Sequence, residues 1–466
     1  MKKLFKYSLI GLVSLIIILL VVIPFLPADT YRSEIEQQVG KALGMDVKLD
    51  ELAFVTIPQP GLAITNITLA EKGRHIASVD SLRLHPRLSS LFSDTPEIRL
   101  MKLSGIRIRP NDIPRFIKPD ESDESQSGSE QSALFIQKIS ADHSYLIVEQ
   151  GNLEQWGPLS FEVDFHPKKG FKSLNLELEE KVFRVSIKPD GDDLAIKIRA
   201  SEWSSLLFQD LTIDSLVMDG HIFSDRLHFK SIDIAAYSGK AKGNLILDWS
   251  DLWRLDSQVS VTSLNLGNLL KAKNNHSLDG SASGSFTLRS YANAVASLAD
   301  NLEIRGDLLV QNGHIYETDL EKAARSLSKE WITGGQTPFD KFSTRFNMLP
   351  EKITLKKLFI QSSVLAANGD LKIISQKELN GEISVGLNDP TGVLTMPLMI
   401  SGTVDEPQVR PTDAALAGGA VGTAVLGPGF GTAVGVKAGE VFSKIGSLFG
   451  SDEDEQETEE KKKDEQ

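Results

Sequence analysis

Residues 161–200 read FEVDFHPKKGFKSLNLELEEKVFRVSIKPDGDDLAIKIRA, and they carry the pattern that sets the class of fold. Apolar side chains occupy every second position in four short runs, with charged or polar residues between them. A period of two is typical of β-strands with one apolar face and one solvated face. Turn residues such as those at 188–191 separate the runs, so the stretch predicts consecutive antiparallel strands.

The same alternation extends from residue 134 to about residue 387, with few helices to cover the apolar face. Such a sheet either folds over into a sandwich, the commoner answer, or curls into a trough lined with apolar side chains. The fold class that we expect is mainly β: a long antiparallel meander curled into an apolar-lined groove, with a few short helices. The residues predicted to line the groove are Phe161, Val163, Phe165, Leu174, Leu176, Phe183, Val185, Ile196, Ile198, Leu245 and Leu247.

An uncharged run at residues 7–28 follows Lys2, Lys3 and Lys6. A bilayer core of ~30 Å needs ~20 apolar residues in a helix, so the run predicts a transmembrane anchor. The lysines place its N-terminus in the cytoplasm and the later residues outside. A cleaved signal peptide is the alternative, but the run lacks a small-x-small site at its end. The residues chosen to represent the anchor are Leu9, Ile16, Ile17, Leu20 and Val22.

Several segments are expected to be helical. Residues 29–43 carry apolar residues at helical spacing, with Asp29 or Thr30 as the cap and Gly44 at the end. Residues 291–301 and 317–331 carry Ala and Leu at a similar spacing and predict two helical inserts.

A glycine stripe lies near the C-terminal end of the sequence, at Gly427, Gly431, Gly435 and Gly439. On a helix, glycines at every fourth position make a smooth surface where another backbone can approach closely. The stripe predicts helix packing or membrane contact, and a flexible Gly/Ala linker is the alternative. The chain is therefore divided into residues 1–28 (cytoplasmic stub and anchor), 29–117 (helix and first β region), 118–132 (acidic, Ser-rich linker), 133–411 (β-groove body), 412–450 (Gly-rich helical segment) and 451–466 (charged tail).

Composition limits the possible functions. The chain has 50 basic and 63 acidic residues, a net charge of −13, which argues against a nucleic-acid partner. It has no cysteine, so disulfides and thiol chemistry are excluded. The eight histidines show no metal-ligand spacing, and no hydrolase or phosphate-loop motif occurs. We expect a protein without enzymatic activity, catalytic residues, metal or cofactor.

Four groups of segments, in this order, resemble the AsmA family of envelope proteins. They are YRSEIEQQV at 31–39 with LGMDV at 43–47, PGLAITNITL at 60–69 with ASVDSLRL at 77–84, LLVQNGHI at 308–315 with Asp319-Leu320, and FI at 359–360 with GDL at 369–371 and ISGTVDEP at 400–407. The resemblance implies an inner-membrane anchor and a periplasmic body of the repeated β-groove type. It also implies a role in moving phospholipid between membranes or in maintaining the outer membrane.

The expected partners are phospholipid acyl chains and the inner membrane, with the outer membrane or other envelope proteins at the Gly-rich segment. The alternative function is a scaffold that assists the targeting and insertion of outer-membrane proteins. An envelope hydrolase is a third possibility for which the sequence offers no residues.

Overall fold

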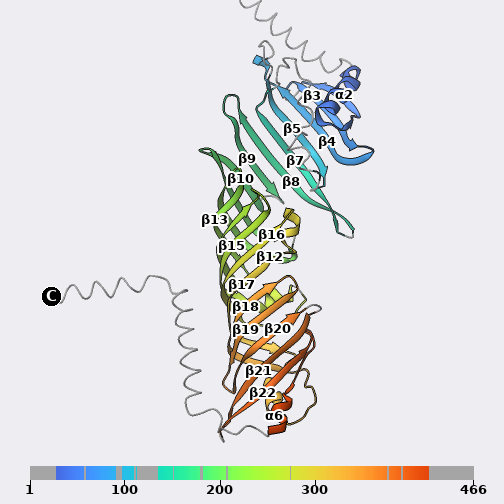
Figure 1. Ribbon diagram of the computed structural model, residues 1–466. Coiled ribbons are helices and arrows are strands. Elements are labelled where there is room, and N and C mark those ends of the chain that lie inside the picture. Colours follow the sequence, from blue (N-terminus) through green and yellow to red (C-terminus); the bar gives the residue numbers. More distant parts are fainter. Residues whose placement is uncertain are drawn as a thin grey trace, which may run out of the picture. The chain divides into compact units, whose positions relative to one another are not determined.

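The computed structural model describes residues 28–56, 59–90, 97–109, 112, 135–150, 152–178, 182–205, 208–272, 274–374, 377–389 and 392–418. These residues contain 23 strands and a few short helices, which confirms the predicted mainly β class (Figure 1). The chain divides into two compact units. The first comprises residues 1–275, 281–307 and 348–350, and the second comprises residues 276–280, 308–347 and 351–466.

The first unit contains most of the strands. They are β1 (Asp46–Lys48), β2 (Glu51–Val55), β3 (Gly61–Glu71), β4 (Arg74–Pro86), β5 (Glu97–Ile108), β6 (Phe135–Ile136), β7 (Lys138–Gln150), β8 (Asn152–His166), β9 (Gly170–Leu178), β10 (Phe183–Asp190), β11 (Asp193–Ser205), β12 (Phe208–Ile222), β13 (Arg226–Ala236), β14 (Gly239–Asp248), β15 (Trp253–Asn265) and β16 (Ser281–Ala292). Its helices are η2 (Ala28–Tyr31), α2 (Arg32–Leu43), η3 (Leu88–Ser90), α4 (Leu266–Lys271) and η6 (Val295–Leu298).

Strands β7 to β16 pair antiparallel in chain order, as the alternating runs predict. The meander has one departure that the sequence did not indicate, because β5 pairs in parallel with β6 and β7. Parallel neighbours need a long connection that returns the chain to the same end of the sheet. Residues 109–134, which include the acidic stretch at 118–132, provide that length. The linker itself lies outside the described residues.

Helix α2 covers the start of the sheet. Ile35 packs against a buried cluster that includes Val47, Leu52 and Ile76. Gly44 ends the helix with a φ of 65°, as predicted, since glycine adopts the left-handed conformation without a steric cost. The predicted cap was wrong. A 3-10 turn, η2, precedes the helix, and Asp29 instead accepts hydrogen bonds from Arg32 at 2.7 Å and from the Leu52 N–H at 3.2 Å.

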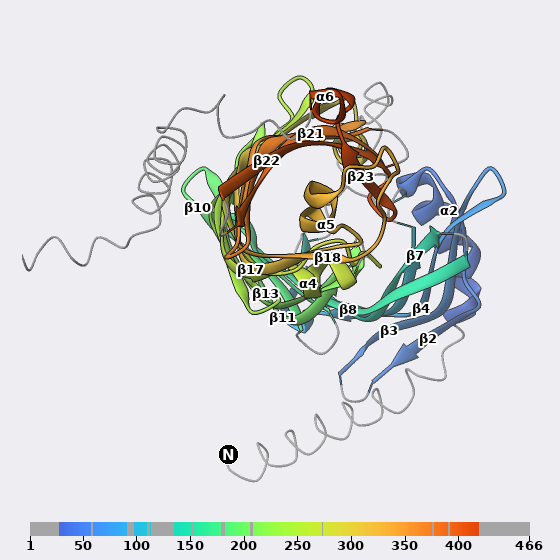
Figure 2. The ribbon, with the colours of Figure 1, turned by 90° about the horizontal axis from the view of Figure 1, so that it is seen from below.

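The second unit has a sheet curled around a short helix. Strands β17 (Glu303–Tyr316) and β18 (Gln336–Leu349) contribute to both units, and the others are β19 (Lys352–Gln361), β20 (Leu365–Ile374), β21 (Glu378–Asp389), β22 (Gly392–Gly402) and β23 (Pro407–Pro411), with helices α5 (Leu320–Arg325) and α6 (Asp413–Gly418). Figure 2 shows β21, β22 and β23 curving around α5, which contacts all three. Ile332 exchanges two backbone hydrogen bonds with Val409 and so pairs with β23.

Both predicted helical inserts are shorter than expected. In residues 291–301 the strand β16 continues to Ala292 and only the four-residue 3-10 turn η6 follows. In residues 317–331 helix α5 spans six residues and ends at Arg325, because the next residue, Ser326, is extended with a ψ of 137°. Helix propensity is weak, and tertiary contacts can override it. In these two segments, sheet pairing and core packing limit the length of the helix.

Two other predictions fall on residues outside the described ranges. The first is the transmembrane anchor, represented by Leu9, Ile16, Ile17, Leu20 and Val22. The second is the glycine stripe at residues 427, 431, 435 and 439. Among the described helices, none is both long enough and apolar enough to cross a bilayer. The anchor and the helical Gly-rich segment therefore stay predictions.

Candidate functional site

One face of the first unit's sheet carries rows of apolar side chains that lie in register across successive strands. We call the face that these rows form on β8 to β16 the apolar face. The first row is Phe161, Leu176, Val185, Ile198, Met218, Ile232, Gly243, Val259 and Phe286. The second row is Val163, Leu174, Ile187, Ile196, Gly220, Phe229, Leu245, Ser257 and Leu288.

The opposite face of the same strands is polar. Lys138 pairs with Glu162 at 3.0 Å, Lys197 with Asp219 at 3.4 Å, and Lys242 with Asp233 at 3.4 Å. Such partly exposed pairs contribute little to stability, but they show that this face meets water. The two-residue period of each strand therefore gives the sheet one polar, solvated face and one apolar face.

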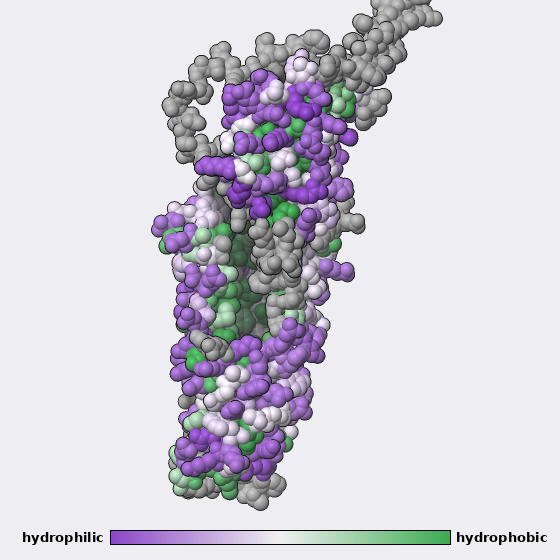
Figure 3. Space-filling view, turned by 90° about the vertical axis from the view of Figure 1, so that its right-hand side faces the viewer, coloured by the Kyte–Doolittle hydropathy of each residue, from purple (hydrophilic) through white to green (hydrophobic). Residues whose placement is uncertain are grey.

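Among the residues that the structure describes, most side chains of the apolar face are only partly buried. Of the eleven residues predicted to line a groove, only Ile196 is buried, at 7% exposure, and the other ten are partly exposed. The buried cluster here has just three members, Ile196, Phe229 and Ile232, with partly buried side chains around it. Figure 3 shows a hollow in this part of the molecule, with hydrophobic residues on its wall.

In the second unit, the apolar face of strands with the same alternation is buried. Val385, Leu387 and Leu398 are completely buried, with 0% exposure, and Ile383 is 1% exposed. Helix α5 fills the concave side of this sheet with Leu320, Ala323 and Ala324, all at most 1% exposed. No comparable cover is recorded for the middle of the apolar face in the residues that the structure describes.

Glycines in the rows allow neighbouring strands to approach closely. Gly220 lies between Ile196 and Phe229, and a Cβ there would overlap the backbone oxygen of His228. A Cβ at Gly243 would likewise overlap the backbone oxygen of Gln258. The ring of Phe229 lies over Gly220, with its Cδ1 atom 2.9 Å from where a Cβ would be, so the apolar surface continues across that position.

At its β15–β16 end the apolar face receives a partial cover from η6. The Ser290 hydroxyl donates to the Leu298 carbonyl at 2.7 Å, and Leu298 is 6% exposed. Ser290 is in register with Leu255, and Leu255 with Leu247. The turn therefore packs at the β16 end of a third row, which contains Leu227, Leu247, Leu255 and Ser290.

All eleven predicted lining residues lie on the apolar face or at its margin. Phe165, at the margin, has its ring 6.4 Å from that of Phe171 on β9. Sequence reasoning missed further members, Met218, Ile232, Val259, Phe286 and Leu288, although the same alternation marks them. The structure brings the set together on one surface, and its contact with a ligand stays a prediction.

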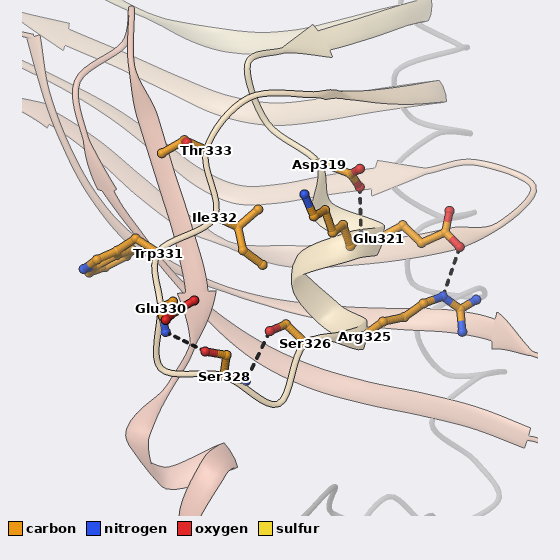
Figure 4. Close-up of a pocket in the computed structure, with 10 residues that line it drawn as sticks. Asp319, Glu321, Arg325, Ser326, Ser328, Glu330, Trp331, Ile332 and Thr333 are labelled. Atoms are coloured by element: carbon orange, nitrogen blue, oxygen red, sulfur yellow. Dashed lines mark hydrogen bonds and ion pairs between the residues drawn. The ribbon is translucent and has the colours of Figure 1, made fainter.

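A separate pocket of about 800 Å³ lies in the second unit, between α5 and the segment that follows it (Figure 4). Its walls are mostly polar, and several of its groups are held by local hydrogen bonds. Arg325 binds Glu321 at 3.1 Å, and Asp319 accepts from the Lys322 N–H at 2.8 Å. A polar, open pocket with mixed charge offers little to an acyl chain.

One cluster of titratable groups outside this pocket is centred on Asp279. Asp279 accepts hydrogen bonds from the Tyr316 hydroxyl at 2.7 Å and from the His314 backbone N–H at 2.5 Å. Partial burial opposes ionisation of Asp279, but these hydrogen bonds outweigh it and lower its pKa. The same bond raises the pKa of Tyr316. Within the described residues, no group of three histidine or acidic side chains is placed to hold a metal ion.

The described residues define a class: a mainly β protein whose sheet in the first unit carries one apolar face and one polar face. The family model of the AsmA family matches residues 1–143 and 166–358, more than half of the chain. The chain therefore belongs to the AsmA family, as its motifs indicated. Neither a curated protein nor a solved structure matches it.

Proposed function

We propose that this protein binds phospholipid acyl chains on the apolar face of its first unit and helps to move phospholipid between the membranes of the cell envelope. In this proposal the predicted helix at residues 7–28 anchors it in the inner membrane, and the β body is periplasmic. The protein acts as a carrier without catalysing a reaction. Membership of the AsmA family supports an envelope role in lipid transport or assembly.

The observation that carries the proposal is the partial exposure of ten of the eleven lining residues, in rows that continue from strand to strand. Each CH₂ group that leaves water gains ~0.8 kcal/mol, so an acyl chain laid along a row is strongly favoured over the same chain in water. The ligand in turn removes the remaining apolar surface of the protein from water.

Site-specific crosslinking tests the proposal directly. A photoreactive amino acid replaces Val185 or Ile198 on the apolar face in the full-length protein, and the matched controls carry it at Arg184 or Arg199 on the opposite face. After irradiation in cells, mass spectrometry should find phospholipid attached at positions 185 and 198 and much less at 184 and 199. Equal labelling of both faces, or no lipid at any position, would contradict the proposal.

An assembly scaffold is the second candidate, favoured by the glycine stripe at 427–439. In that case a crosslinker at Phe430 or Val434 should capture an outer-membrane protein or its assembly machinery. Capture of lipid alone at these positions would favour the carrier.

A further inference from the structure

Trp203 lies at the margin of the apolar face, close to the turn that joins β11 and β12. It belongs to β11 and is in register with Ile213 of β12. Its ring packs on Phe183, with the ring centroids 4.8 Å apart and the planes at 38°. Phe183 is a member of the apolar face and is in register with Leu178 and Ala200.

The local backbone explains how this indole comes to the apolar side. Glu202 has a φ of 50°, in the left-handed region, which interrupts the regular alternation between the Ser201 and Trp203 pairs. Glu202 is exposed, whereas Trp203 and Ile213 are partly buried. The interruption therefore turns an aromatic residue toward Phe183 at the margin of the face.

The indole N–H of Trp203 is buried and has no hydrogen-bond partner among the described residues. A tryptophan can only donate, and buried donors in native proteins are nearly always satisfied. Trp249 shows the ordinary arrangement, since its indole N–H donates to the Ser224 carbonyl at 3.1 Å. Trp203 thus places a buried donor without a partner among the described residues beside the partly exposed apolar face.

We propose that the Trp203 indole N–H binds an oxygen acceptor that is attached to an acyl chain lying on the apolar face. This inference rests on the proposed function and assigns the polar end of the same ligand. A neutral donor in an apolar setting suits an ester carbonyl or a carboxylate, and it offers nothing to a pure hydrocarbon. The hydrocarbon part of the ligand then ends at the Phe183–Trp203 pair, and its oxygen-bearing group lies next to the Trp203 indole.

The test compares three probes on the full-length protein in detergent: palmitate, a dipalmitoyl phospholipid and hexadecane. Trp203→Phe keeps an aromatic ring and removes the N–H, and Trp249→Phe is the matched control. We expect Trp203→Phe to weaken binding of the oxygen-bearing probes by about 2- to 10-fold, the worth of one hydrogen bond, and to leave hexadecane nearly unchanged. The palmitate and phospholipid results show whether a carboxylate or an ester is the acceptor.

A second variant separates the N–H from the shape of the ring. Trp203→β-(3-benzothienyl)alanine keeps a bicyclic ring with sulfur in place of the N–H, and it should reproduce the selective loss if Trp203→Phe fails to fold. A similar loss for all three probes, or no loss for any, overturns the role of the N–H while the proposed function stands. Failure of the wild-type protein to bind all three probes overturns both.

Discussion

Asp279 illustrates how single polar residues fasten the ends of strands in this protein. Its carboxylate holds residues 276–280 against the end of β17 through Tyr316 and His314, beside the Leu278–Ile315 bridge. The hydrogen bonds lower its pKa below the ordinary value of 3.8. A lowered pKa means that the bonded carboxylate stabilises the folded segment above about pH 3.8, and that this stability is lost as pH falls through the lower, folded value.

Tyr316→Phe should therefore weaken the segment in a pH-dependent way. At pH 7 the variant lacks the hydrogen bond from Tyr316 to the Asp279 carboxylate, so the segment should exchange faster than in the wild type. The difference from the wild type should shrink as pH falls from about 3.8 through the lower, folded pKa of Asp279, where the folded carboxylate becomes protonated. Hydrogen exchange of residues 276–280 and 314–316, referenced to unstructured peptide at each pH, measures it.

The control for that prediction is Tyr291→Phe, because Tyr291 is 54% exposed. It should leave the exchange of these residues unchanged at every pH. A pH-independent effect of Tyr316→Phe would show that the tyrosine contributes packing and that its bond to Asp279 matters little.

Trp203 and the row glycines show what the sequence did not reveal at this scale. The alternation places Phe183 and Ile198 on a face, but nothing in it marks Glu202 as left-handed or the indole N–H as unpartnered. Both depend on the backbone conformation of β11 and on its packing against its neighbours, which the two-residue alternation does not encode. The contribution of Gly220 likewise becomes visible only when His228 is seen beside it.

At the scale of elements, the strands and helix α2 could be predicted from the sequence, whereas the two helical inserts were predicted too long. The runs in residues 161–200 become β8 to β11 with the expected faces, because a two-residue period is a local property. Helix α5 was predicted too long, since its extent depends on the sheet that encloses it. The same holds for the sealed second unit: β21 and β10 alternate in the same way, and only tertiary structure shows which one is covered.

Helix α5 should be the main support of the second unit's core. Leu320 is 1% exposed, and the helix contacts β21, β22 and β23. Leu320→Ala removes buried methyl groups and leaves a cavity, so we expect a loss of ~2–5 kcal/mol in that unit. Thermal unfolding, together with hydrogen exchange of β21 and β22, provides the measurement.

Leu327→Ala is the matched control, because Leu327 lies two residues beyond α5 and is 76% exposed. It should change stability by less than ~0.5 kcal/mol. If both substitutions had the same small effect, α5 would be a peripheral helix and the core would be held by the strands alone.

For the whole molecule, the contrast between the units predicts a divided response to lipid. The first unit has a partly exposed apolar face, whereas the second has a core in which Val385, Leu387 and Leu398 are fully buried. A ligand that binds only the folded first unit stabilises that unit by mass action. Delipidated full-length protein given phospholipid should gain hydrogen-exchange protection in β8 to β15 and little in β20 to β22. Uniform protection, or protection confined to the second unit, would contradict a carrier role for the apolar face.

The in-register rows have a consequence for motion. From β8 to β13 the first row presents Phe161, Leu176, Val185, Ile198, Met218 and Ile232, one for each strand. A hydrocarbon displaced sideways by one strand, ~4.8 Å, exchanges one set of methyl and methylene neighbours for another of the same kind. Its free energy therefore changes little from one strand to the next. Net movement of lipid along the row takes its direction from the difference in the lipid's chemical potential between the two ends, and the row itself imposes no direction.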